Sequence, residues 1–284
     1  MTLILLATGA DMPELCSDDQ LLLRALREHG IAARAVVWSD PAVSWGDASL
    51  VVIRSTWDYV ERVEDFLQWV RRVDAVAPLL NSRALVERNW HKSYLRELVA
   101  RGVAVVPARW YSAGQPVQVD EALAVWGTVA IKPAVGANGL DLLVGDDTLR
   151  DELQSHAERL ISRHDLIVQK FLSSVAVEGE LSLVYVDGMY AHTIRKFAGD
   201  GDYRVQEEHG GHAELATPPE PERSIADSLV ESVGGSLYAR VDFLYDDGRP
   251  VVGEFELIEP ELYFRYHPPT IDRMVAAITN RLGL

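Results

Sequence analysis

The chain contains a single cysteine, Cys16, among its 284 residues. One cysteine excludes an intramolecular disulfide framework and a cysteine-rich zinc site. Cys16 stands next to the start of a predicted helix, where a thiol can be activated. An incidental cysteine is the favoured interpretation, because no further motif surrounds it.

Basic residues are also scarce, with 27 Lys and Arg against 43 Asp and Glu and a formal net charge of −16. This balance argues against nonspecific binding to nucleic acid and against an anionic membrane surface. It does not argue against one anionic nucleotide held in a local basic pocket. We therefore expect neither nucleic acid nor membrane among the partners.

Long apolar runs are missing, and no stretch has the length needed to span a bilayer. The first residues, MTLILLATGADMPEL, hold a short apolar run without a basic leader. They predict a buried strand and not a signal peptide. The expected location is the cytoplasm.

Several catalytic signatures are absent as well. The sequence has no HExxH, GxSxG, Walker A or GxGxxG motif and no close cluster of His and Cys. Nothing local therefore indicates a zinc protease, a serine hydrolase, a P-loop enzyme or a dinucleotide-binding enzyme.

The N-terminal part alternates apolar strands with helices. Strands are predicted over 2–7, 31–38 and 50–54, and helices over 18–29 and 61–74. This order indicates a parallel, doubly wound sheet, which binds ligands at the carboxyl ends of its strands.

RSTWDY follows the third of these strands, at such an end. There Arg54 can clamp a carboxylate and Asp58 can hold an ammonium, with Ser55 beside them. A structural ion pair is the alternative for Arg54, and the strand-end position favours the ligand.

The rest of the chain has mostly antiparallel character. A helix over 84–101 carries Lys92, and strands are predicted around VAIKPAV, DLLVG and DLIVQKFL. Strands near 180–187 and 190–197 come next, then a polar loop over 198–213 and a helix over 221–234. Helix 270–282 ends the chain. Long loops without structure of their own tend to be functional, so Arg204 and His209 in loop 198–213 are candidate ligand contacts.

The segment YARVDFLYDDGRPVVGEFELIEP predicts a hairpin interrupted by charges. Asp242 stands two residues after Arg240, and Glu256 two after Glu254, so each pair shares one strand face. Unpaired carboxylates inside a fold are very costly. A hard divalent ion such as Mg²⁺ would neutralise them and usually arrives with nucleotide phosphates. The hairpin therefore indicates phosphoryl chemistry.

Lys132 ends a predicted strand, and the small residues of 136–139 form a turn behind it. Backbone N–H groups in such a turn can approach phosphate oxygens, to which the lysine adds a point charge. A plain hairpin turn with a surface lysine is the alternative. Glu180, at a strand start, could accept hydrogen bonds from ribose hydroxyls, and a solvated carboxylate is its alternative.

The order of these features resembles the ATP-grasp superfamily, in particular the branch of bacterial glutathione synthetase. The resemblance extends over most of the chain. Asn81, Lys92 and Pro107 match the segment that bears the first ATP lysine. VAIKPAVGANG is similar to the second ATP lysine with its glycine loop, and IVQKFL to the hinge whose backbone around 170–172 contacts adenine. RVQEEHGG resembles the loop that closes over the phosphates.

The resemblance implies an ATP-grasp fold, in which an N-terminal parallel α/β domain (1–88) precedes two α+β subdomains (89–170 and 171–284) that sandwich the nucleotide. It implies ATP and Mg²⁺, with two ions expected, and metal ligation by Asp242, Glu254 and Glu256. The implied nucleotide contacts are Lys92, Lys132, Gly136, Gly139, Gln169, Lys170, Phe171, Leu172, Glu180 and Lys196. The implied catalytic groups are Arg240, Arg204 and Lys196.

For the substrate we expect contacts from Arg54, Ser55, Asp58, Arg204, His209, Gly210 and Glu259. One departure concerns the last metal ligand, which is usually Asn in the superfamily and is Glu256 here. Glu254 with Glu256 is the preferred pair, and Glu256 with Glu259 is the alternative if a bulge intervenes.

The resemblance implies an ATP-dependent carbon–nitrogen ligase, which activates a carboxylate-like group of an amino-acid-like small molecule as an acyl phosphate for attack by an amine. RSTWDY with ELIEPELYF is similar to small ligases related to the D-cycloserine-forming synthetase, in which the amine belongs to the same molecule. A non-catalytic ATP-binding regulator and a Rossmann-type oxidoreductase are the alternatives. Similar ligases are often dimers or tetramers, and the sequence leaves the oligomeric state open.

Overall fold

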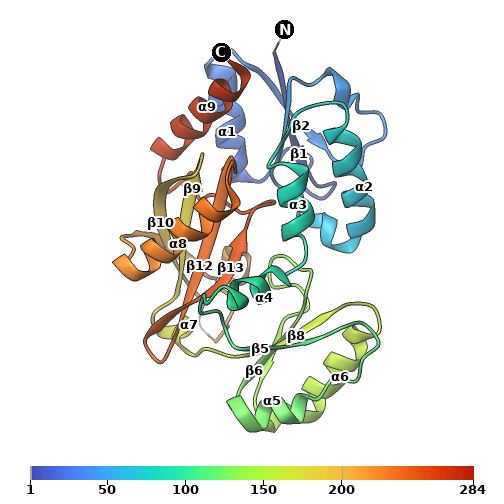
Figure 1. Cartoon of the computed structure of the whole chain (residues 1–284), viewed down its shortest axis with the longest axis vertical. Helices are drawn as coiled ribbons and strands as arrows, with labels where there is room; N and C mark the ends of the chain where they lie inside the picture. The colour runs from blue at the N-terminus through green and yellow to red at the C-terminus, as the bar shows by residue number, and fades with distance from the viewer. Residues whose placement is uncertain (1, 200) are drawn as a thin grey trace.

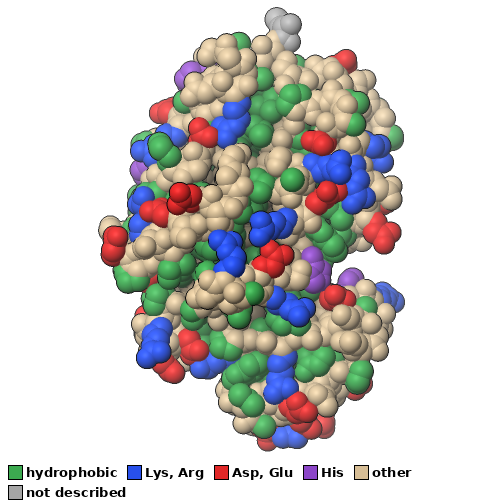
Figure 2. Space-filling model, viewed as in Figure 1, with side chains coloured by type: hydrophobic (Ala, Val, Ile, Leu, Met, Phe, Trp, Pro, Cys, Tyr) green, Lys and Arg blue, Asp and Glu red, His purple; other side chains and the backbone are tan. Residues whose placement is uncertain are grey.

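The computed structural model describes residues 2–199 and 201–284, which form three β-sheets with helices packed against them (Figure 1). Asp200, within the predicted loop 198–213, lies outside the described residues. In Figure 2 the molecule is indented at its right-hand edge, between the lowest part, which holds α5 and α6, and the part above it. No helix over the described ranges is both long and apolar enough to cross a membrane.

The N-terminal sheet is parallel, as predicted. Its strand order is β2 (Ala32–Val37), β1 (Leu3–Thr8), β3 (Leu50–Ile53) and β4 (Leu79–Leu80). Alternate residues of β1 face opposite sides, as a pleated strand requires. Ile4 and Leu6 pack on α1 (Ser17–Glu28) and α9 (Pro269–Leu282), whereas Leu5 and Ala7 pack on α2 (Val63–Asp74).

The second sheet is antiparallel, in the order β5 (Ala108–Tyr111), β8 (Leu166–Lys170), β6 (Val129–Pro133) and β7 (Leu143–Gly145). One face packs on α5 (Val119–Trp126) and α6 (Arg150–Ile161) through Val129, Ile131 and neighbours. The alternate residues of β6, Ala130 and Lys132, therefore face the opposite side, where they line a cavity.

The third sheet is also antiparallel and places the acidic hairpin at its edge. Its order is β11 (His212–Ala216), β10 (Met189–Phe197), β9 (Glu180–Val186), β12 (Tyr238–Asp246) and β13 (Arg249–Glu256). One apolar face packs on α4 (Tyr94–Ala100) and α8 (Glu220–Val233). The predicted loop 198–213 is shorter than expected, because its last residues join β11 and pair with β10. The short helix α7 (Ser174–Val177) follows β8.

The prediction of a single helix over 84–101 is wrong. The segment forms two helices, α3 (Arg83–Asn89) and α4, with a break that contains Lys92. The break is stabilised by tertiary contacts, since the Lys92 N–H donates to the Ala134 carbonyl at 2.9 Å. The Asn89 side chain donates to the Phe255 carbonyl at 2.8 Å. Lys92 is thereby turned toward the hairpin and is not on a helix surface.

Asn81 joins the end of β4 to the third sheet. Its amide donates to the carbonyls of Tyr238 and Leu257 at 2.8 and 2.7 Å and accepts from the Leu237 N–H at 2.6 Å. The side chain is fully buried. Removing it would leave buried backbone groups without partners, and each such group costs on the order of 1–3 kcal/mol.

We therefore expect Asn81→Ala to lower the free energy of unfolding by roughly 3 kcal/mol or more. Urea unfolding followed by circular dichroism measures this change. Asn280→Ala, on the exposed side of α9, is the matched control and should change stability by less than about 0.5 kcal/mol. An equal effect of both variants would contradict the buried role of Asn81.

Candidate active site

A cavity of about 590 Å³ lies between the second sheet, the third sheet and the loops at the carboxyl ends of the first. It is lined by charged side chains from β6, β9, β10, β12 and β13 and by apolar side chains from β6 and β7. The three sheets thus meet at one place, and most of the predicted site residues lie there.

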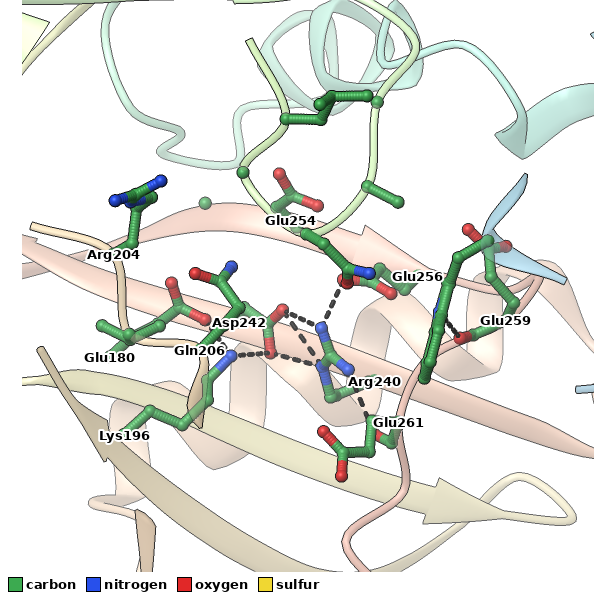
Figure 3. A pocket seen from close by; sticks show the side chains of 18 of the residues that line it. Glu180, Lys196, Arg204, Gln206, Arg240, Asp242, Glu254, Glu256, Glu259 and Glu261 are labelled. Atoms are coloured by element: carbon green, nitrogen blue, oxygen red, sulfur yellow. Dashed lines mark hydrogen bonds and ion pairs between the residues drawn. The ribbon is translucent and has the colours of Figure 1, made fainter. Parts of the chain in front are cut away.

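The hairpin places its charged residues opposite one another, as the strand alternation predicted. Arg240 pairs with Glu256 across the two strands, and Asp242 pairs with Glu254. Arg240 donates from Nε to Asp242 at 2.9 Å and from Nη2 to Glu256 (Figure 3). The register shift in β13 falls at Gly253, because Phe243 pairs with Val252. The bulge therefore precedes Glu254, so the Glu256–Glu259 alternative gains no support from it.

Two lysines that are far apart in sequence meet on one carboxylate of this hairpin. Lys92 Nζ lies 2.9 Å from Glu254 Oε2, and Lys132 Nζ lies 3.2 Å from Glu254 Oε1. Lys196, on β10, pairs with Glu180 and lies 3.9 Å from Asp242 Oδ1. The structure thus brings the three predicted phosphate-binding lysines to the same cluster as the three acids.

The carboxyl groups of the hairpin differ in pKa. Burial opposes ionisation of Glu254, but Lys92 and Lys132 outweigh it and hold its pKa well below the usual range. Burial raises the pKa of Glu256 to about 7; Asp242 and Glu254 add to this effect and Arg240 opposes it. At neutral pH the acids of the cluster, with Glu180 included, are thus matched by basic side chains, and Glu256 is partly protonated.

The donor set fits a divalent cation. Carboxylate oxygens are the ligands that Mg²⁺ prefers, and such a cation would offset both the burial and the neighbouring acids that raise the pKa of Glu256. Over the described residues, no three acidic, His or Cys side chains are already arranged as a metal site. Each acid of the hairpin instead contacts a basic side chain of the chain itself.

The predicted phosphate, adenine and ribose contacts come from both antiparallel sheets. Gly136, Gly139, Gln169, Phe171, Leu172 and Glu180 line the cavity, together with the apolar side chains of Ala130, Leu142, Val144 and Leu244. The side chain of Lys170 does not. It alternates with Gln169 and Phe171 along the strand and binds Asp246 at 2.5 Å, outside the cavity.

The loop before β11 lies over the cavity. Arg204 lines it and binds Asp202 at 2.7 Å. Glu207 accepts hydrogen bonds at 2.8 Å from both Arg265 and Tyr266, which ties the loop to the segment after β13. His209 and Gly210, which were predicted to contact substrate, are not among the lining residues.

The predicted substrate clamp of the first sheet has internal partners instead. Arg54 is fully buried; it donates to Asp19 at 2.8 Å and to the Pro260 carbonyl at 2.8 Å. Ser55 donates to the same Asp19 at 2.7 Å. Asp58 accepts from Trp38 Nε1 at 2.7 Å.

Arg54, Ser55 and Asp58 therefore do not line the cavity. The structure does not show the expected clamp on a substrate carboxylate, because Asp19 of α1 takes the place of that carboxylate for Arg54.

The side chains of RSTWDY that line the cavity are aromatic. Trp57 and Tyr59, within the same RSTWDY segment, line it, as do Trp90, Tyr94 and Tyr263. The segment Trp57–Glu61 is a 3-10 helix, so strand alternation along RSTWDY does not indicate which of its side chains face the cavity. The tyrosines outside this segment carried no recognisable signal in the sequence.

Cys16 also lines the cavity. Burial and the nearby Asp19 raise the pKa of its thiol to about 12. The position beside the α1 start therefore does not activate it, which agrees with an incidental cysteine.

Glu259 lines the cavity beyond the end of β13 and is 8% exposed. Burial and the charge of Glu256 raise its pKa from 4.5 to about 8, although the charge of Lys92 and the nearby Tyr59 side chain oppose the shift. The folded protein therefore binds a proton at this group over a pH range in which the unfolded chain releases it.

Because the folded pKa of Glu259 is raised, its carboxyl makes the ligand-free protein less stable as pH rises from about 4.5 toward about 8. We expect Glu259→Gln to become progressively more stable than the wild type across this window, by roughly 1 kcal/mol per pH unit. Urea unfolding at pH 5 and pH 8 with chelator present measures the difference. Glu231→Gln, exposed on α8, should show no such trend.

Three comparisons with known proteins each find similarity to D-cycloserine synthetase DcsG. The family model described as D-cycloserine synthetase DcsG, N-terminal domain, matches residues 4–81. The cycloserine biosynthesis protein DcsG of Streptomyces lavendulae is 31% identical over 99% of both chains.

Among solved structures, D-cycloserine synthetase DcsG superposes with a TM-score of 0.87 at 29% identity over 99% of each chain. The ATP-grasp ligase PsnB, solved with precursor, Mg and ADP, superposes with a TM-score of 0.64 at 15% identity over 96% of this chain and 97% of that one. The architecture is thus the ATP-grasp fold, and the chain belongs to the D-cycloserine synthetase family of ATP-dependent ligases.

Proposed function

We propose that this ligase closes a carbon–nitrogen bond within one amino-acid-like molecule, as the formation of D-cycloserine requires. The observation that carries the ligase chemistry is the convergence of Lys92 and Lys132 on Glu254 in the cavity. The substrate class is supported by the full-length similarity to DcsG. An ATP-dependent ligase replaces both alternatives, the non-catalytic regulator and the dinucleotide-dependent oxidoreductase.

The charged cluster is suited to exchange partners when a nucleotide binds. In this arrangement Lys92 and Lys132 would leave Glu254 for phosphate oxygens, and Lys196 would do the same from Glu180. Asp242, Glu254 and Glu256 would then hold Mg²⁺, two ions in our proposal, which would supply charge neutralisation between the phosphates. The cavity thus has both signs of charge ready, each compensated internally.

The chemistry needs no side-chain nucleophile. We infer that a substrate carboxylate takes the terminal phosphoryl group of ATP and that the nitrogen of the same molecule then displaces phosphate. Arg240, aimed at the hairpin acids, would stabilise negative charge on the transferring group and on the tetrahedral centre. The loop that Arg265 ties down through Glu207 would exclude water, which otherwise hydrolyses an acyl phosphate.

The boundaries 1–88, 89–170 and 171–284 stay our proposal for the subdomains. Two cores cross them: residues of α9 pack with β1, and residues of α4 pack with β9 and β12. The proposed boundaries therefore divide the sequence, whereas elements from different subdomains share one hydrophobic core.

Lys132 provides the test of the phosphate-binding assignment. We expect Lys132→Met to raise the KM for ATP roughly 10- to 100-fold, because a charge-assisted contact of this kind contributes about 1.5–3 kcal/mol. ADP release in the presence of candidate open-chain amino acids measures this. Lys170→Met, on the neighbouring strand but outside the cavity, should leave the KM within about twofold. Equal effects of the two variants would remove Lys132 from the site.

A further inference from the structure

Glu259 differs from the other acidic residues around the cavity, because it has no Lys or Arg partner among the residues that the structure describes. Glu14, which is exposed, also lines the cavity. The remaining acids of the lining all pair with a basic side chain; they are Glu180, Glu207, Asp242, Glu254, Glu256 and Glu261. Glu259 is 8% exposed, so solvent does not take the place of a partner.

The backbone that carries Glu259 is held in place by three side chains. Trp57 Nε1 donates to the Glu259 carbonyl at 3.0 Å. Arg54 donates to the Pro260 carbonyl at 2.8 Å, and Arg240 to the Glu261 carbonyl at 3.0 Å. The carboxyl group is therefore presented from a fixed backbone, and the internal role of Arg54 contributes directly to this.

The Tyr59 side chain lies close to the carboxyl group of Glu259 and opposes the rise of its pKa. In the view of Figure 3, Glu259 lies beyond Glu256, on the opposite side from Glu180 and Lys196. It therefore belongs to the end of the cavity away from the predicted ribose contact.

A buried carboxyl group without a basic partner ionises at a cost, and a bound cation lowers that cost because it stabilises the charged form. Trp57 and Tyr59 line the cavity beside Glu259, and aromatic faces attract cations. Mg²⁺ is the less suitable occupant, because Asp242 stands opposite Glu254 and not opposite Glu259.

We propose that Glu259, oriented by Tyr59 and Trp57, binds the amino group of the substrate as an ammonium ion. This inference rests on the proposed function, since it takes the substrate to be an amino acid. It replaces the expected contact between ammonium and Asp58, whose carboxylate is bound to Trp38 and to the Ala10 N–H at 3.0 Å.

Two ring compounds test the assignment, D-cycloserine and isoxazolidin-3-one, which is the same ring without the amino group. Their affinities are measured by titration calorimetry at pH 7 with ADP, Mg²⁺ and phosphate present. The wild type should bind D-cycloserine roughly 10- to 100-fold more tightly than isoxazolidin-3-one. In Glu259→Gln this ratio should fall to within about threefold, because the amide offers no negative charge. Glu231→Gln is the matched control and should keep the wild-type ratio.

Tyr59→Phe removes one hydroxyl and serves if Glu259→Gln does not fold. We expect it to lower the ratio at least about threefold. If the folded Glu259→Gln protein keeps the wild-type ratio of the two affinities, the ammonium assignment is wrong. The same holds for Tyr59→Phe if only that variant folds. Either result would leave the ligase function standing. A wild type that binds neither ring would overturn the cyclisation and this inference together.

Discussion

Asp242→Asn is expected to lower the rate of ADP release by roughly 10³-fold, the scale of losing a charged group that acts on a phosphoryl transfer. Asp242 is 2% exposed and lies between Arg240 and Lys196, opposite Glu254. Asparagine keeps the shape and still accepts a hydrogen bond from Arg240. It removes only the negative charge that a divalent cation requires, so the concentration of Mg²⁺ needed for half-maximal rate should rise as well.

The matched control is Asp246→Asn on the same strand. Asp246 pairs with Lys170 and lies outside the cavity, so its loss should leave the rate within about twofold. Thermal unfolding of both variants checks that each is folded. A folded Asp242→Asn protein with the full rate would contradict the metal assignment.

The charged hairpin could be predicted from the sequence because its geometry is local. Two strands joined by a short turn have one register, and the alternation of side chains then decides which residues share a face. This is why the positions of Arg240, Asp242, Glu254 and Glu256 agree with the expectation. The bulge at Gly253 shifts the register without separating the two acids.

Arg54 shows what local reasoning could not reach. A strand-end arginine is equally suited to a ligand carboxylate and to a carboxylate of the protein. Asp19, from a helix that precedes Arg54 by some thirty residues, decides between them. That choice depends on how α1 packs across the sheet, which no pattern within RSTWDY contains.

The helix predicted over 84–101 was wrong for a similar reason. Its residues have ordinary helical propensity throughout, but tertiary contacts override propensity. The Lys92 N–H binds the Ala134 carbonyl at 2.9 Å, next to the glycine-bearing turn. The two predicted ATP lysines are thus positioned by one contact between segments that are more than forty residues apart.

Arg240→Lys is expected to have an equally large effect, a fall in kcat of roughly 10³-fold, while ATP still binds. The planar guanidinium contacts Asp242, Glu256 and the Glu261 carbonyl at once. A lysine ammonium has one nitrogen and cannot reach all three partners, so the hairpin acids and the segment that carries Glu259 would no longer share one cation. Burial opposes the charge of Arg240, but Asp242 and Glu256 hold its pKa well above the usual range, so the wild-type group is always charged.

A split between binding and rate separates a catalytic role of Arg240 from a merely structural one. Calorimetry with ATP should give a Kd for Arg240→Lys within about fivefold of the wild type, because the lysines that we propose to bind the phosphates are intact. Steady-state ADP release should show the loss in kcat. Arg249→Lys, exposed at the turn of the same hairpin, should match the wild type in both measurements. If Arg240→Lys loses ATP binding and stability together but keeps kcat within tenfold, Arg240 organises the hairpin without acting on the transferring group.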